Sequence, residues 1–260
     1  MSSEVYRNTI QQPSDRVIVA LDKMNWEQAG EVMSEVGEHV GMAKANSIAQ
    51  KLGWIHAVEK IASFGAATMA DAKYHDIPDT VRLHIAEAAD CNPQFITIHA
   101  SSVVEMLKAA AEGRDQIRET KKGHYSDDDV ARIGGILGVT VLTSIGEEDC
   151  VSIYGDSPKK KVLQFARIAK EAGIDGIVCS GKELKIIREQ DDLNDLLTVV
   201  PGITPAWAQK AGDQKRVVTP TEAIQNGADF IVVGRAITQP PEGISRAEAA
   251  QRIAQELGEA

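Results

Sequence analysis

The chain has 260 residues, of which 43% are hydrophobic and 25% charged, and its formal net charge is −10 at pH 7. This length and composition are typical of a globular protein with one large or two small domains, and they exclude a disordered chain. The acidic balance argues against non-specific binding to nucleic acid or an anionic membrane surface, and no apolar run approaches the roughly 18 residues that span a bilayer.

The N-terminal segment contains no long apolar stretch and therefore does not resemble a signal peptide. The three cysteines, Cys91, Cys150 and Cys179, are odd in number and widely spaced, which favours neither a disulfide framework nor a zinc site. We therefore expect a cytoplasmic protein with reduced thiols, no membrane segment and no nucleic-acid partner.

Short β-branched runs alternate along the chain with longer stretches in which apolar residues recur at helical spacing. The eight runs span residues 16–21, 41–45, 67–72, 95–100, 136–142, 176–180, 196–200 and 229–234. Most are apolar without alternation, as expected for strands buried on both faces, and their order predicts parallel pairing with right-handed crossovers. Eight such units predict a single (β/α)8 TIM barrel over residues 1–260. An open doubly wound sheet is the alternative, but no GxGxxG follows the first run.

Two stretches depart from the repeat. Residues 113–135 are highly charged, and we expect them to form a solvated surface loop on the amino-end side of the barrel. Residues 201–220 form the longest segment after a strand end. Because loops after strand carboxyl ends build the active site of this fold, this second segment is a candidate lid.

Four charged residues of alternating sign follow the first three predicted strands. Asp71 and Lys73 are two residues apart at the end of the third strand, so in a regular strand they point to the same face. Lys44 ends the second strand and Asp22 the first. Neighbouring parallel strands bring these ends together, and four such charges are costly there unless each is paired or used. This convergence predicts a catalytic site at the barrel mouth.

The end of the eighth strand predicts a phosphate site. Gly234 allows close backbone approach, and Arg235 supplies a planar fork of donors suited to phosphate. The Pro-Gly pair at 201–202 ends the seventh strand, and loops after the seventh and eighth strands frequently build the phosphate site of a barrel.

Taken together, these motifs resemble those of the orotidine 5'-phosphate decarboxylase family over nearly the whole chain. The pattern D-x-K-x-x-D-I-P-x-T is highly specific, because barrel relatives share only its D-x-K-x-x-D part. The matching blocks are ALD (20–22), Lys44, DAKYHDIPDT (71–80), TIHAS (97–101), LGVTVLTS (137–144), DGIVCS (175–180), PGI (201–203), AGDQKRVVTP (211–220) and VVGRAITQ (232–239).

The resemblance implies conversion of orotidine 5'-monophosphate to UMP and CO2 in pyrimidine synthesis, with no cofactor and no metal. Lys73 would donate the proton to C6 of the pyrimidine, Asp71 would lie beside the substrate carboxylate, and Lys44 would bridge Asp71 and the ribose. Asp76 and Thr80 would reach the ribose of the neighbouring subunit's substrate, which implies a homodimer with shared active sites.

The remaining substrate contacts are also implied by the resemblance. Asp22 would bind a ribose hydroxyl, Thr143 and Ser144 would lie near the pyrimidine, and Gln214 would bridge base and phosphate. Gly234 and Arg235 would hold the phosphate.

The sequence departs from the family pattern at a few site positions. Thr204, a candidate substrate-binding residue, stands where bacterial members carry an arginine that contacts phosphate. Arg235, Gln214 and backbone N–H groups would then have to hold the phosphate. Asn46 replaces a glycine beside Lys44, and Ser102 replaces another after the fourth strand.

Two other functions stay open at this point. One is a Mg²⁺-dependent decarboxylase or aldolase of sugar phosphates on the same barrel, which the I-P-x-T suffix and the G-D-Q segment disfavour. The other is a non-catalytic barrel that binds a phosphorylated metabolite, which the altered positions favour. The intact array of Asp22, Lys44, Asp71 and Lys73 opposes it, since binding alone does not need such neighbours.

Overall fold

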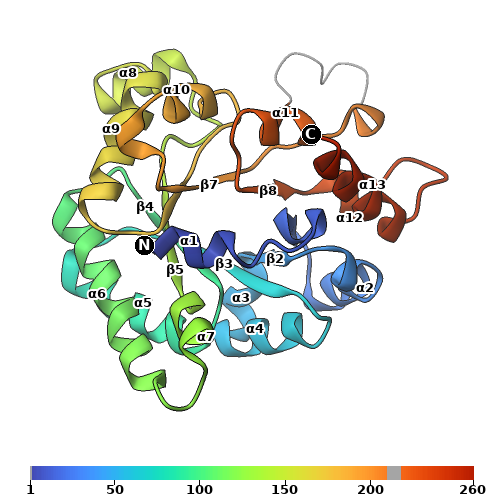
Figure 1. Ribbon diagram of the computed structural model, residues 1–260, viewed down its shortest axis with the longest axis horizontal. Helices are drawn as coiled ribbons and strands as arrows, with labels where there is room; N and C mark the ends of the chain where they lie inside the picture. Colours follow the sequence, from blue (N-terminus) through green and yellow to red (C-terminus); the bar gives the residue numbers. More distant parts are fainter. Residues whose placement is uncertain (1, 210–217) are drawn as a thin grey trace.

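The computed structural model describes residues 2–209 and 218–260, and within them eight parallel strands close into one barrel (Figure 1). The strands follow one another in sequence order, and β1 pairs with β8 to complete the ring. The closed (β/α)8 barrel is therefore confirmed, and the open sheet is excluded. The strands are β1 (Val17–Ala20), β2 (Met42–Ala45), β3 (Ala67–Tyr74), β4 (Phe95–His99), β5 (Gly135–Val139), β6 (Gly176–Val178), β7 (Leu197–Val200) and β8 (Phe230–Val233).

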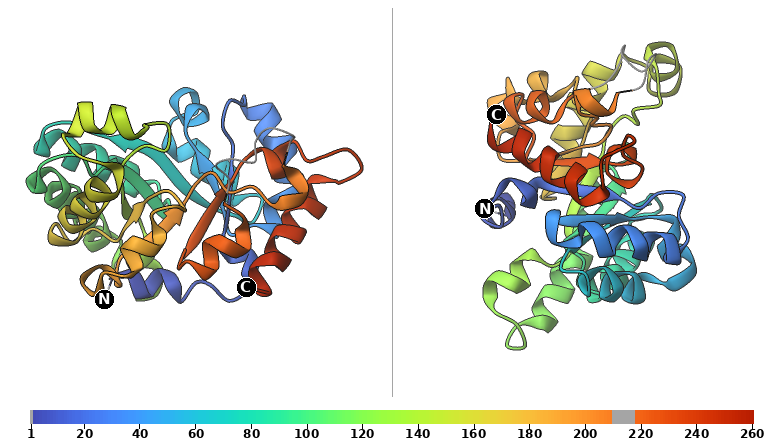
Figure 2. Two further views of the ribbon diagram at one scale, coloured as in Figure 1. Left: turned by 90° about the horizontal axis from the view of Figure 1, so that it is seen from above. Right: turned by 90° about the vertical axis from the view of Figure 1, so that its right-hand side faces the viewer.

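The helices surround this barrel, and both termini lie on its outside (Figures 1 and 2). Local capping fixes several of their starts; for example, the side chain of Asn25 accepts a hydrogen bond from the N–H of Gln28 at the start of α2. The helices are α1 (Ser2–Arg7), α2 (Trp26–Val36), α3 (Ser47–Leu52), α4 (Trp54–Ala62), α5 (Pro78–Asp90), α6 (Val104–Lys121), α7 (Asp127–Arg132), α8 (Glu147–Tyr154), α9 (Pro158–Glu171), α10 (Leu184–Arg188), α11 (Pro220–Gln225), α12 (Arg235–Thr238) and α13 (Arg246–Gly258).

The prediction of a loop over 113–135 is wrong, although residues 122–129 within it are exposed to solvent as predicted. Most of this segment continues α6 and then forms α7. Arg114 is only 5% exposed because its guanidinium pairs with the buried carboxylate of Asp175. Gly113 allows α6 to pack closely against α5, since a Cβ there would lie 2.3 Å from the carbonyl oxygen of Arg82 in α5. Tertiary partners therefore bury the two ends of a stretch whose composition alone is typical of a surface loop.

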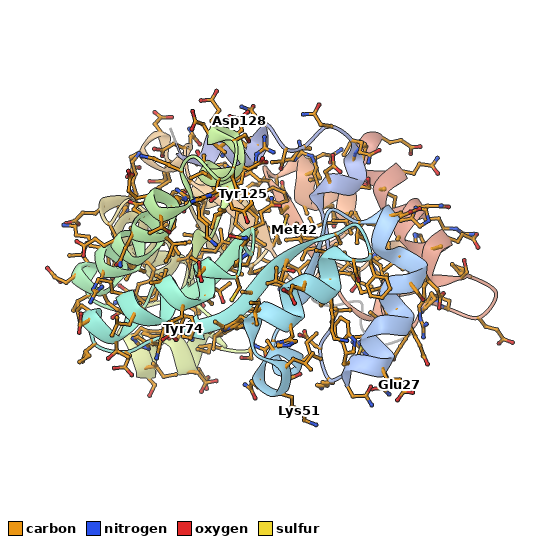
Figure 3. All side chains as sticks on the ribbon, turned by 90° about the horizontal axis from the view of Figure 1, so that it is seen from below. Glu27, Met42, Lys51, Tyr74, Tyr125 and Asp128 are labelled. Atoms are coloured by element: carbon orange, nitrogen blue, oxygen red, sulfur yellow. The ribbon has the colours of Figure 1, made fainter. Side chains whose placement is uncertain are left out.

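The amino ends of the strands form a closed base. Tyr6 of α1 is fully buried, and its ring lies 4.9 Å from that of Phe95. Phe95 in turn contacts Phe230 edge-on inside the barrel, at 5.4 Å between ring centroids. In Figure 3, Asp128 of α7 lies at one end of the molecule, whereas Glu27 and Lys51 lie at the opposite end. The base is therefore filled by side chains, which leaves the carboxyl ends of the strands for a site.

Candidate active site

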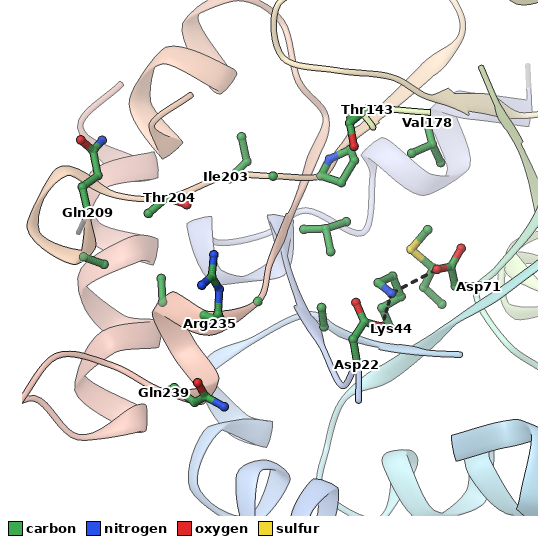
Figure 4. A pocket seen from close by; sticks show the side chains of 18 of the residues that line it. Asp22, Lys44, Asp71, Thr143, Val178, Ile203, Thr204, Gln209, Arg235 and Gln239 are labelled. Carbon is green, nitrogen blue, oxygen red and sulfur yellow. Dashed lines mark hydrogen bonds and ion pairs between the residues drawn. The ribbon is translucent and has the colours of Figure 1, made fainter. Parts of the chain in front are cut away.

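A cavity of about 770 Å³ opens at the carboxyl ends of the strands (Figure 4). Its apolar walls include Met69, Val139 and Ile203, and charged groups lie at both ends. Eight of the residues predicted for the site line it: Asp22, Lys44, Asp71, Lys73, Thr143, Thr204, Gly234 and Arg235. The cavity thus has apolar walls between two polar ends.

Alternating charges form a continuous chain at one end of the cavity. The Nζ atom of Lys44 lies 2.6 Å from Oδ1 of Asp22 and 3.1 Å from Oδ2 of Asp71. The same Oδ2 lies 2.5 Å from Nζ of Lys73. The predicted convergence of these four residues is therefore confirmed, and Figure 4 shows the Asp22–Lys44–Asp71 part of it.

Pairing favours the charged forms of the two buried members of this array, Asp71 and Lys44. Burial alone would raise the pKa of Asp71, but the ammonium groups of Lys44 and Lys73 outweigh it and hold the pKa below its ordinary value. Burial would likewise lower the pKa of Lys44, but the carboxylates of Asp71 and Asp22 raise it. The side chain of Lys73 stays 34% exposed toward the cavity. The Lys73 side chain is thus held at the cavity wall by a buried carboxylate.

The backbone reaches this geometry by a route that simple strand alternation does not predict. β3 loses its regular register with β4 between Ala70 and Tyr74, and Lys73 adopts a left-handed conformation with φ 51°. That conformation costs a non-glycine residue about 1–2 kcal/mol. The expectation that both side chains share a face of a regular strand is wrong in its geometry, although they do meet.

Two residues hold this irregular segment without having been assigned a role from the sequence. Thr97 of β4 bonds both the backbone N–H of Lys73 and the carboxylate of Asp71. Asn46, which follows β2, bonds the backbone carbonyl of Asp71. Thr97 falls inside a matched block and Asn46 was noted as a departure, but neither pattern reveals that β3 is irregular here.

The opposite end of the cavity carries the predicted phosphate residues. Arg235 begins α12 directly after β8, and Figure 4 shows it together with Thr204, Gln209 and Gln239 on the side away from Asp71. Gly202, in the Pro-Gly pair after β7, has φ 77°, a conformation that residues other than glycine rarely adopt. Guanidinium, hydroxyl and amide donors at this end suit an anionic oxygen group.

Three predicted site residues, Ser144, Asp76 and Thr80, are not among the residues that line the cavity. Ser144 and Asp76 are exposed, and Thr80 lies in the first turn of α5. Oδ1 of Asp76 accepts a hydrogen bond from the N–H of Ile77 at 2.7 Å, within its own turn. Gln214 lies outside the described residues. The predicted lid, residues 201–220, supplies wall residues at its start, Ile203 and Thr204 among them, and its part over 210–217 lies outside the described residues.

Comparison with known proteins decides the family. The family model "Orotidine 5'-phosphate decarboxylase / HUMPS family" matches residues 15–252. The chain belongs to the orotidine 5'-phosphate decarboxylase family. A curated orotidine 5'-phosphate decarboxylase from Heliobacterium modesticaldum is 37% identical over 250 residues, covering 94% of this chain and 96% of that protein. One from Syntrophomonas wolfei is 37% identical and is covered completely, with 95% of this chain aligned.

Solved structures agree with this assignment. The orotidine 5'-phosphate decarboxylase of Lactobacillus acidophilus superposes with a TM-score of 0.75 at 32% identity, covering 93% of this chain and 98% of that one. The chain is therefore an enzyme of the decarboxylase class. Within the described residues, no helix has the length and apolarity needed to cross a membrane.

Proposed function

We propose that this chain decarboxylates orotidine 5'-monophosphate to UMP and CO2 without a cofactor or metal, in pyrimidine synthesis. The observation that carries the proposal is the ammonium of Lys73, held 2.5 Å from the buried Asp71 at the cavity wall. The donors around Arg235 at the other end fit the phosphate of such a substrate. The named relatives support the same activity.

The chemistry requires charge stabilisation and a proton rather than an electron sink. When the bond from C6 to the carboxylate breaks, CO2 leaves and an electron pair remains at C6 in an orbital that the ring π system cannot delocalise. The Lys73 ammonium stabilises that charge and then transfers a proton to C6, forming the C–H bond of UMP. Asp71 repels the substrate carboxylate, and this repulsion disappears with CO2. Solvent then reprotonates Lys73.

Remote contacts have to contribute to the rate as well. The total reduction of the barrier is on the order of 20 kcal/mol for the slowest uncatalysed reactions, whereas proton transfer by one group supplies only about 10²–10⁴-fold. Binding energy from the phosphate end, through Arg235 and its neighbours, therefore has to order the site around the reacting ring. The two polar ends of the cavity are separated, so one end can bind the phosphate while the other carries out the reaction at the ring.

The engagement of the site carboxylates favours a reaction without metal. Oδ2 of Asp71 accepts from both lysines and its Oδ1 accepts from Thr97. Oδ1 of Asp22 accepts from Lys44. A magnesium ion at this array would have to displace ammonium groups that already neutralise these oxygens.

The experiment is loss of orotidine 5'-monophosphate absorbance with purified protein, with and without EDTA. Turnover to UMP that is unchanged by EDTA is the expected result. Complete loss on chelation with recovery on adding Mg²⁺ would establish the metal-dependent alternative instead. Tight binding of the substrate with no turnover would establish a non-catalytic binding barrel.

The active unit in this proposal is a homodimer with shared sites. Asp76 and Thr80 lie at the start of α5, away from their own cavity wall. Ile77 is 66% exposed there, and Val103, which precedes the neighbouring α6, is 60% exposed. Both apolar side chains would be covered if a second subunit docked on this rim and received Asp76 in its site.

Mixing two inactive variants tests the shared site. Lys73→Ala and Asp76→Ala lesions fall into different sites only if Asp76 serves the partner, so a mixed dimer then holds one site with both lesions and one intact site. Activity should recover as subunits exchange, with native mass spectrometry to confirm heterodimers. Confirmed heterodimers without recovered activity would leave Asp76 as a local residue of the α5 turn.

A further inference from the structure

The hydroxyl of Thr97 lies at the point where β3 departs from regular pairing. Ala70 pairs with Ile96, and the next pair joins Tyr74 to Ile98. The three β3 residues 71–73 therefore face Thr97 alone. Bulges of this kind redirect side chains and are frequent beside active sites. Here the redirected residues are the two central members of the charge array.

One buried hydroxyl serves both of those residues. Thr97 is fully buried; its Oγ1 accepts the backbone N–H of Lys73 at 2.9 Å and donates to Oδ1 of Asp71 at 3.0 Å. A hydroxyl has one donor hydrogen and two acceptor lone pairs, so it can make both bonds at once. Because Oδ1 of Asp71 is occupied in this way, Oδ2 is the oxygen that faces both ammonium groups.

The other side of the bulge is held by Asn46. Its Nδ2 atom donates to the backbone carbonyl of Asp71 at 2.7 Å, from the residue that follows β2. β4 and the residue after β2 thus each supply one side chain to the irregular segment. Thr97 fixes its N–H and carboxylate groups, and Asn46 fixes its carbonyl.

We propose that Thr97 and Asn46 are positioning residues for the decarboxylation, which hold the Asp71–Lys73 bulge so that the Lys73 ammonium faces the substrate. The inference rests on the proposed function. Lys73 occupies a left-handed conformation that a lysine does not favour, so the surrounding bonds have to maintain it. Without them β3 can relax toward regular pairing, which removes the left-handed turn that now places the Lys73 ammonium 2.5 Å from Asp71.

The test compares Thr97→Val, which keeps the shape and removes the hydroxyl, with Thr97→Ser, which keeps the hydroxyl. For Thr97→Val we expect kcat to fall about 10- to 100-fold, as for loss of a hydrogen bond to a charged group, with KM within about threefold of the parent. Thr97→Ser should keep most of kcat. Losing a donor to the charged carboxylate also raises the pKa of Asp71, so the acid limb of kcat should move to higher pH.

A purely structural role predicts a different pattern. Thr97→Val would then lower the unfolding midpoint while the folded enzyme kept the parent kcat and acid limb, and this result would overturn the proposal. Asn46 is only half-buried, so Asn46→Ala provides a second variant should Thr97→Val fail to fold. Asn46→Ala should lower kcat by a smaller factor than Thr97→Val, and an unchanged kcat would count against the positioning role.

Failure of the proposed function is recognised separately. If the unaltered chain does not decarboxylate the substrate, the proposed function is wrong. A crystal structure of Thr97→Val then tests whether Thr97 holds the Asp71–Lys73 bulge. Departure of Lys73 from its left-handed conformation and separation of its Nζ from Asp71 would support the positioning role of Thr97. Retention of both would overturn it.

Discussion

The two ends of the barrel both bury ion pairs, but they use them differently. At the base, Arg114 and Asp175 are 5% and 1% exposed, and Asp175 also accepts the N–H of Ile136. At the rim, Lys44 and Asp71 are 9% and 5% exposed, so burial hardly distinguishes the two pairs. The Arg114–Asp175 pair lies in the closed base near the buried Tyr6, whereas the Lys44–Asp71 pair lines the cavity.

The difference shows that a buried ion pair does not by itself indicate a catalytic site. Three features separate the rim from the base: access to a cavity, lysines that can transfer a proton where the base uses an arginine that cannot, and a left-handed lysine backbone. The base should therefore determine stability, and the rim should determine rate. Variants at each end can break this division.

The largest effect is expected for Lys73→Ala. It removes both the charge that stabilises the C6 electron pair and the proton that C6 receives, so kcat should fall by more than the roughly 10²–10⁴-fold of acid–base loss alone. Steady-state decarboxylation measures it, with circular dichroism as the control for folding. A variant within tenfold of the parent would mean that another group supplies the proton.

At the base, Arg114→Met should act on stability alone. It leaves Asp175 buried without its cation, so the free energy of unfolding should fall by about 3–5 kcal/mol. Chemical denaturation measures this loss, and kcat measured below the unfolding transition should equal that of the parent. A large fall in kcat of the folded variant would show that the base also shapes the active site.

A smaller effect that depends on pH is expected at Glu183, which precedes α10. Burial raises the pKa of Glu183 to about 7. The hydrogen bond that its carboxylate accepts from the N–H of Ser180 lowers the pKa, but by less than burial raises it. The folded state therefore holds the proton more tightly than the unfolded state, and stability falls as pH rises from about 4.5 through 7.

Glu183→Gln removes that titration and should stabilise the protein by about 2–3 kcal/mol at pH 8 and by almost nothing at pH 4. Denaturation curves at the two pH values measure the difference. Equal effects at both would show that the carboxyl group does not titrate with the folding equilibrium.

The comparison of the two ends also explains what sequence could predict. The strands and the meeting of Asp22, Lys44, Asp71 and Lys73 follow from hydrophobic runs and parallel order, which are local patterns. The burial of Arg114 depends on Asp175, 61 residues away, so composition suggested a loop where a helix forms.

The bulge in β3 was equally inaccessible to pattern analysis. A two-residue spacing predicts a shared face only in a regular strand, and the irregularity arises from hydrogen bonds that Thr97 and Asn46 supply from neighbouring strands. The roles of Asp76 and Thr80 stay predictions, because they concern a second subunit.

The unfolding free energy of Lys73→Gly tests the central claim that the rim is built for rate and not for stability. Glycine adopts φ near 51° without strain, which offsets the ion pair lost with a side chain already 34% exposed. We predict a free energy of unfolding within about 1 kcal/mol of the parent, together with loss of decarboxylation. A fall of several kcal/mol, like that expected for Arg114→Met, would contradict the account by making Lys73 a structural residue.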